Sequence, residues 1–66
     1  MNLNTQKIEI LIAEQGITRT QLAEQSGLAR QNLSTIIRRG TAEPRTVGKL
    51  AKGLGVDVAD IVEKEE

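Results

Sequence analysis

The sequence predicts a compact all-α domain of five short helices. Apolar residues recur at three- and four-residue spacing along most of the chain, and glycines stand where four of the predicted segments end. No segment shows the alternation of apolar and polar residues that predicts a strand. Sixty-six residues are enough for one domain only. The core of this domain must be aliphatic, because the sequence contains no Phe, Tyr or Trp.

The first helix is predicted between Asn4, which can cap its N-terminus, and Gly16, which stands where the periodic pattern stops. A second helix follows at once. The run TRTQ that begins at Thr18 matches a capping box, in which the threonine hydroxyl and the side chain of Gln21 satisfy two backbone amides. We expect this second helix to reach about Gln25.

A third helix is predicted over about residues 29–39 and a fourth over about residues 47–53. Between them residues 41–45 are expected to form a loop, because the residue before Pro44 disfavours helix. Thr46 can then cap the fourth helix.

The chain beyond the fourth helix predicts a short fifth helix that opens at Asp57, with Asp60 three residues later. An acidic tail, residues 63–66, ends the sequence, and its residues 64–66 are expected to fray. Aliphatic side chains are numerous for so short a segment. We expect some of them to pack in the core and some to form the interface of a dimer. These residues are Val56, Val58, Ile61 and Val62.

The third helix combines an apolar stripe with a polar face that lacks acidic residues. The stripe consists of Leu33, Ile36 and Ile37, and it is expected to face the core. No acidic residue stands opposite to form the i,i+4 ion pairs that usually solvate an exposed helix. The polar face consists of Arg30, Gln31, Ser34, Thr35 and Arg38. An ordinary solvated helix start would also explain Arg30, Gln31 and Asn32.

Charge is separated along the chain although the net charge is zero. From Thr18 to Arg45 five arginines stand against two glutamates, which leaves a net charge of +3. From Asp57 to Glu66 five acidic residues stand against one lysine, which leaves −4. A neutral protein with this distribution can meet a polyanion with its basic face.

The join between the second and third helices follows the helix-turn-helix pattern over about residues 19–38. Ala23 is small, as close crossing by the following helix requires, and Gly27 can adopt the positive φ of the tight turn. The apolar faces of the helix pair are supplied by Leu22, Leu28, Leu33 and Ile36.

Three stretches, LAEQSGL from Leu22, LSTI from Leu33 and KLAKGLGV from Lys49, closely resemble the Cro/repressor (XRE-type) helix-turn-helix family, as found in phage and mobile-element regulators. The resemblance covers about residues 7–62. It implies a five-helix domain like that of lambda repressor, usually dimeric, whose third helix enters the major groove of DNA. The sequence departs from the family in two places. Ala29 stands where Ser or Thr commonly caps the third helix, and that helix carries one more residue before its final glycine.

The outward side chains of the third helix supply what base readout requires. Arginine can donate a bidentate pair to guanine, glutamine or asparagine can pair with adenine, and hydroxyl groups can reach a base or a thymine methyl. The candidate base contacts are Arg30, Gln31, Asn32, Ser34 and Thr35. The start of the second helix and the basic end of the third helix are suited to contact DNA phosphates. The candidate phosphate contacts are Thr18, Arg19, Thr20, Arg38, Arg39 and Thr41. Arg38 and Arg39 would equally suit the negative end of a helix.

Several other classes of function find little support. Without cysteine or histidine the chain forms no disulfide and lacks the usual ligands for zinc, iron or copper. Ser26 and Ser34 have no histidine to activate them, so we expect neither an enzyme nor a cofactor. The longest apolar run has four residues, so we expect a cytoplasmic protein that does not enter a membrane.

We therefore expect a sequence-specific transcriptional regulator, and specifically a repressor that binds a double-stranded DNA operator as a homodimer. The alternative is a protein-interaction module, such as an antitoxin or an adaptor, that retains the same fold.

Overall fold

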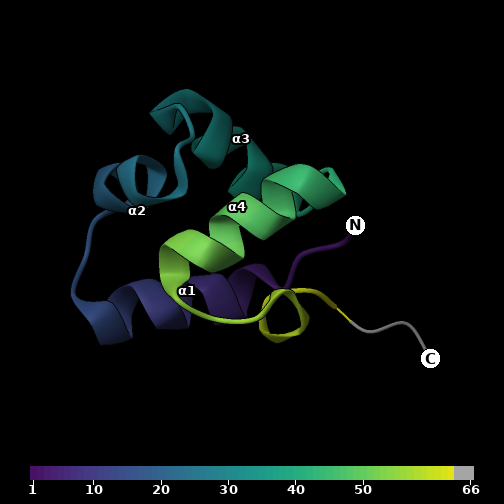
Figure 1. The fold of residues 1–66 in the computed structure, drawn as a ribbon, viewed down its shortest axis with the longest axis horizontal. Helices are drawn as coiled ribbons and strands as arrows, with labels where there is room; N and C mark the ends of the chain where they lie inside the picture. Colours follow the sequence, from purple (N-terminus) through teal and green to yellow (C-terminus); the bar gives the residue numbers. More distant parts are fainter. Residues whose placement is uncertain (64–66) are drawn as a thin grey trace.

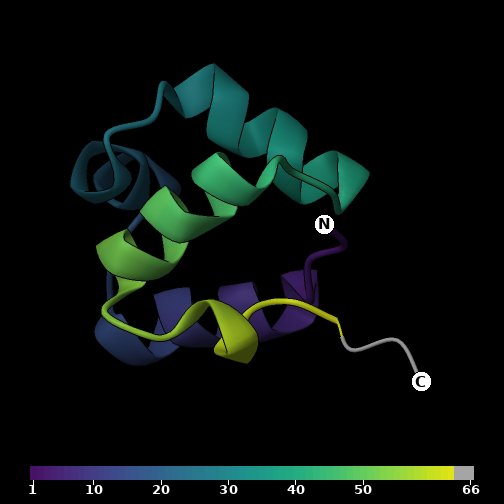
Figure 2. The ribbon, with the colours of Figure 1, turned by 45° about the vertical axis from the view of Figure 1, so that its right-hand side comes forward.

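Four α-helices and one 3₁₀ turn make up the part of the chain that the computed structural model describes, residues 1–63. The helices are α1 (Thr5–Gln15), α2 (Arg19–Ser26), α3 (Arg30–Arg39) and α4 (Pro44–Leu54), and the 3₁₀ turn is η1 (Val58–Asp60). α4 lies in the middle of the molecule, with α1 on one side and α3 on the other (Figure 1 and Figure 2). The predicted all-α class is confirmed.

Local caps fix the ends of α1 and α2 where the sequence predicts them. Before α1, the side chain of Asn4 accepts a hydrogen bond from the Lys7 amide at 3.0 Å. Before α2, Thr18 Oγ1 accepts from the Gln21 amide at 3.1 Å, and Gln21 Oε1 accepts from the Thr18 amide at 2.8 Å. Gly27 ends α2 with a φ of +70°, a left-handed conformation that turns the chain toward α3. The predicted capping box and glycine turn are confirmed.

The core is aliphatic, and α4 supplies four of its buried residues. These are Val47, Leu50, Ala51 and Leu54. Their buried partners from the rest of the chain are Leu3, Ile8, Leu22, Ala23, Leu33, Ile36 and Ile61. Gly53 lies against the end of α2, because a Cβ atom there would collide with Ser26 Oγ and would lie 3.0 Å from Ser26 Cα. α4 therefore needs a residue without a side chain at this position.

The predicted start of α4 is wrong by three residues. Pro44 is the first residue of the helix, where its missing amide proton costs nothing and its fixed φ suits helical backbone. Glu43 has the extended φ and ψ of −70° and 152° that a residue before proline prefers. The loop predicted over residues 41–45 therefore covers only residues 41–43, and Thr46 is not a cap.

The predicted fifth helix opens at Asp57 as expected, where Asp60 Oδ2 accepts a hydrogen bond from the Asp57 amide at 3.2 Å, but it is only the single turn η1. After η1 the chain leaves helical geometry at Ile61, whose carbonyl oxygen accepts a hydrogen bond from the Asn4 amide at 2.8 Å. The Glu63 amide then donates to Asn2 O at 3.0 Å. Backbone pairing with the N-terminus thus takes the place of further helical hydrogen bonds.

Residues 1–3, called the N-terminal segment below, lie between this C-terminal stretch and the turn that follows α3 (Figure 2). Two backbone hydrogen bonds, of 2.8 and 3.1 Å, join the segment to residues 40–42, so that Asn2 and Thr41 form an antiparallel pair. The side chain of Leu3 is 3% exposed and belongs to the core. No local pattern in the sequence predicts that this segment docks there.

The end of the predicted acidic tail, residues 64–66, lies outside the described residues. Within residues 1–63 no helix has the length and apolar character needed to cross a membrane. The same residues contain no group of three His, Cys, Asp or Glu side chains that could hold a metal ion.

Candidate nucleic-acid interface

α3 buries one face and leaves the other open to solvent. Leu33 is fully buried, Ile36 is 6% exposed and Ile37 is half-buried against the core, so the predicted apolar stripe is confirmed. Ala29 occupies the N-cap position of α3 but makes no side-chain hydrogen bond to the helix. The start of α3 is therefore held by packing of its apolar stripe and not by a cap.

The candidate base contacts on α3 differ in their exposure to solvent. Arg30, Gln31 and Ser34 are exposed. Thr35 is half-buried, and its hydroxyl donates to Gln31 O at 3.0 Å. This hydroxyl can accept a hydrogen bond from a base but has no proton left to donate, whereas the threonine methyl group can contact thymine.

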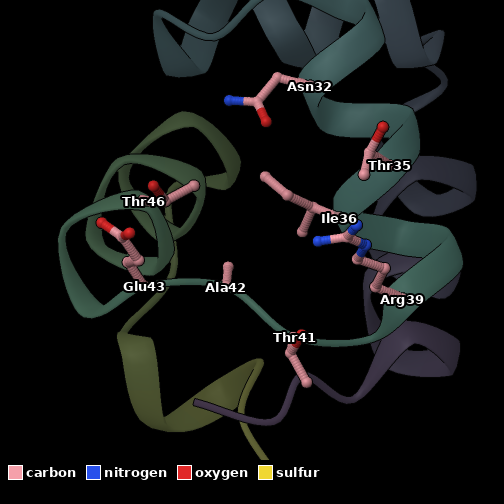
Figure 3. A pocket seen from close by; sticks show the side chains of 8 residues that line it. All are labelled: Asn32, Thr35, Ile36, Arg39, Thr41, Ala42, Glu43 and Thr46. Atoms are coloured by element: carbon pink, nitrogen blue, oxygen red, sulfur yellow. The ribbon is translucent and has the colours of Figure 1, made fainter.

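A hollow of about 360 Å³ opens beside α3, between that helix and the start of α4 (Figure 3). Asn32 and Arg39 extend from α3 toward this hollow, and Thr46 stands on the opposite wall. The structure thus places Asn32 on the α4 side of α3. The residues that line the hollow are Asn32, Thr35, Ile36, Arg39, Thr41, Ala42, Glu43 and Thr46.

The start of α2 carries three of the candidate phosphate contacts. Thr18 and Thr20 are exposed, and the Thr18 hydroxyl already accepts the capping hydrogen bond. The Arg19 guanidinium donates to Glu9 Oε1 on α1 at 2.7 Å, with side chains 47% and 48% exposed. Glu9 could not be predicted as part of this site, because no local pattern in the sequence shows that α1 passes beside the start of α2. A phosphate that binds Arg19 must share it with Glu9 or displace Glu9.

α2 and α3 are thus two helices joined by a glycine turn, and α3 exposes a polar face. The helix-turn-helix family model matches residues 8–61, most of the chain. The chain belongs to the XRE-type helix-turn-helix family. This is a family of DNA-binding regulators and not of enzymes. Comparison with curated proteins and with solved structures found no match.

In this helix-turn-helix protein the remaining candidate phosphate contacts lie at the C-terminal end of α3. Arg38 and Arg39 are exposed in its last turn, where the helix dipole also favours positive charge. Thr41 is exposed in the turn that the N-terminal segment holds. Glu43 and Thr46 could not be predicted beside α3 from the sequence, because their approach to that helix depends on the path of the turn between α3 and α4.

The four candidate dimer residues differ in what they expose. Ile61 is fully buried in the core of the single chain, which removes it from the candidate interface. The other three are partly buried and pack against the core, so they keep some surface that a second copy could contact. They are Val56, Val58 and Val62.

Proposed function

We propose that this helix-turn-helix protein is a sequence-specific transcriptional repressor that places α3 in the major groove of double-stranded DNA. The observation that carries the proposal is the exposed face of α3, which is polar and contains no acidic residue from Arg30 to Arg39. An α-helix fits the major groove, and arginine, glutamine and hydroxyl groups match the donors and acceptors on base edges.

In this proposal Arg30 and Gln31 read bases directly, with Asn32, Ser34 and Thr35 as further base contacts. The start of α2 and the end of α3 bind phosphates and so fix the register of α3 on the duplex. Two copies bind half-sites about one turn of DNA apart, as helix-turn-helix dimers do. Repression follows because the bound dimer blocks access of polymerase to the operator.

Selection of bound sequences from a pool of random duplexes tests the proposal and yields the operator, its symmetry and the half-site spacing together. Affinity should fall steeply between low and moderate salt, because cations that contact phosphates release condensed counterions. A protein that binds no duplex even at low salt would contradict the proposal and favour a protein partner instead.

Arg30→Ala and Gln31→Ala test base reading. Each substitution should weaken operator binding by roughly 1–3 kcal/mol and relax the preference at particular base pairs. Gln6→Ala is the control, because Gln6 is exposed on α1, which lies across α4 from α3 (Figure 2). If both α3 variants bind operator and random DNA as the parent does, α3 does not read bases through these residues.

A further inference from the structure

Two residues of opposite charge, Arg39 and Glu43, line the hollow beside α3 without forming an ion pair. The Arg39 guanidinium points into the hollow from the last turn of α3, and Glu43 stands on the opposite wall, just before Pro44 (Figure 3). Among residues 1–63 the only ion pair joins Arg19 to Glu9. Both side chains are exposed, and neither charge is neutralised by an ion pair within the described residues.

The Glu43 carboxylate makes no hydrogen bond that holds α4 in place. Glu43 occupies the N-cap position, yet its side chain accepts no hydrogen bond from the first amides of the helix. Its backbone carbonyl accepts the first hydrogen bond of the helix, from the Val47 amide at 2.9 Å. What the carboxylate contributes to the fold is its negative charge near the positive end of α4.

The other polar groups around the hollow suit an anion. Arg39 supplies a guanidinium, Thr41 and Thr46 supply hydroxyl groups, and Asn32 supplies an amide. Glu43 is the one acidic residue among those that line the hollow. With α3 in the major groove, the backbone of one DNA strand passes along this side of the helix. There the carboxylate repels a phosphate and attracts the guanidinium that the phosphate would bind.

We propose that Glu43 lowers the affinity of this protein for DNA by competing with a backbone phosphate for Arg39. The inference rests on the proposed function, since it requires α3 to lie in the groove. Phosphates are present in every sequence, so Glu43 weakens binding to operator and to random DNA alike. More of the affinity for the operator must then come from base contacts.

The test compares Glu43→Gln with Glu14→Gln. Each substitution removes one negative charge at nearly constant side-chain size, but Glu14 is exposed on α1, across α4 from α3 (Figure 2). Glu43→Gln should tighten binding to operator and to random duplexes by about three- to tenfold at about 0.05 M salt, and the gain should shrink as salt screens the charges. Glu14→Gln should change either affinity by less than about twofold.

A double variant tests the competition for Arg39 directly. In an Arg39→Gln background, Glu43→Gln should give a smaller gain in DNA affinity than it gives in the parent, because the guanidinium for which Glu43 competes is absent. An equal gain in both backgrounds would overturn the role of Arg39 in the inference.

A stability measurement separates this role from a merely structural one. Glu43→Gln should lower Tm by about 1 to 4 °C, because α4 loses a favourable charge at its start, while DNA binding improves. If the parent binds DNA, any of three results for Glu43→Gln overturns the inference. The DNA affinity of the variant is unchanged or weaker, its gain in affinity is no larger than that of Glu14→Gln, or its effect is confined to particular base pairs. Failure of the parent to bind any duplex overturns the proposed function itself, and the inference falls with it.

Discussion

Gly53 has no side chain because the end of α2 occupies the space where one would stand. A Cβ on Gly53 would lie 3.0 Å from both Cα and N of Ser26, whereas a Cβ on Gly48, in the same helix, would meet nothing within 4 Å. Gly53→Ala should therefore lower the free energy of unfolding by about 1–3 kcal/mol. Gly48→Ala should raise it by up to about 1 kcal/mol, because alanine is the better helix former. Urea denaturation checks the prediction, and a change of the same sign in both variants would contradict it.

Ala29 leaves the start of α3 without a side-chain cap, although its backbone has the extended φ and ψ of −70° and 143° that suit an N-cap residue. Ala29→Ser should raise the free energy of unfolding by about 1 kcal/mol, because the new hydroxyl can accept from the Asn32 amide. Ala13→Ser is the control, since Ala13 is exposed within α1 and has no free amide to cap. Thermal denaturation of both variants measures the difference. A gain in the control as large as that of Ala29→Ser would show that capping is not its cause.

At the scale of secondary structure, the sequence predicts the helices whose ends are set by residues close to them in the chain. α1 and α2 begin at side-chain caps and end at left-handed glycines, so patterns of a few residues suffice to place them. The start of α4 offers two competing signals, Thr46 as a cap and Pro44 as a first residue, and local sequence does not rank them. The stretch after η1 pairs with the N-terminal segment, about sixty residues away in the chain, which no local pattern records.

The N-terminal segment should be docked in solution as it is in the structure, and a disulfide can test this. Asn2 and Thr41 form an antiparallel pair of the kind whose Cα atoms lie about 4.5 Å apart, within the range that a disulfide spans. The chain contains no cysteine, so Asn2→Cys with Thr41→Cys can form only this bridge within one chain. Oxidation should raise the free energy of unfolding by about 2 to 4 kcal/mol, measured by urea denaturation with and without reductant.

The single variant Asn2→Cys is the control for this experiment, since it has no intramolecular partner. Its stability should not change when reductant is added. If the double variant fails to form the bridge under mild oxidation, or gains no stability from it, the segment does not hold the turn after α3 in solution.

At the scale of the whole molecule, the sequence predicts which face of α3 is polar and exposed but not which residues of other elements surround it. The periodicity of α3 separates its polar residues from its apolar stripe without any knowledge of the fold. Glu9 beside Arg19 and Glu43 across from Arg39 come from other helices and a turn, and they enter the site only once α1 and α4 are placed. Both are acidic, so the surface around α2 and α3 is less basic than the arginines alone suggest.

The salt dependence of DNA binding should therefore come from a few individual cations. The formal net charge of the chain is zero, so net charge adds no long-range attraction to DNA. Arg38→Gln should reduce the slope of log affinity against log salt by about 1 for each bound protomer, because one phosphate contact is lost. Lys7→Gln makes the same change in net charge at an exposed position on α1 and should leave the slope as it is in the parent. Titrations over a range of salt concentrations measure both slopes. If Arg38→Gln also keeps the slope of the parent, the charge of Arg38 serves the C-terminal end of α3 and not DNA.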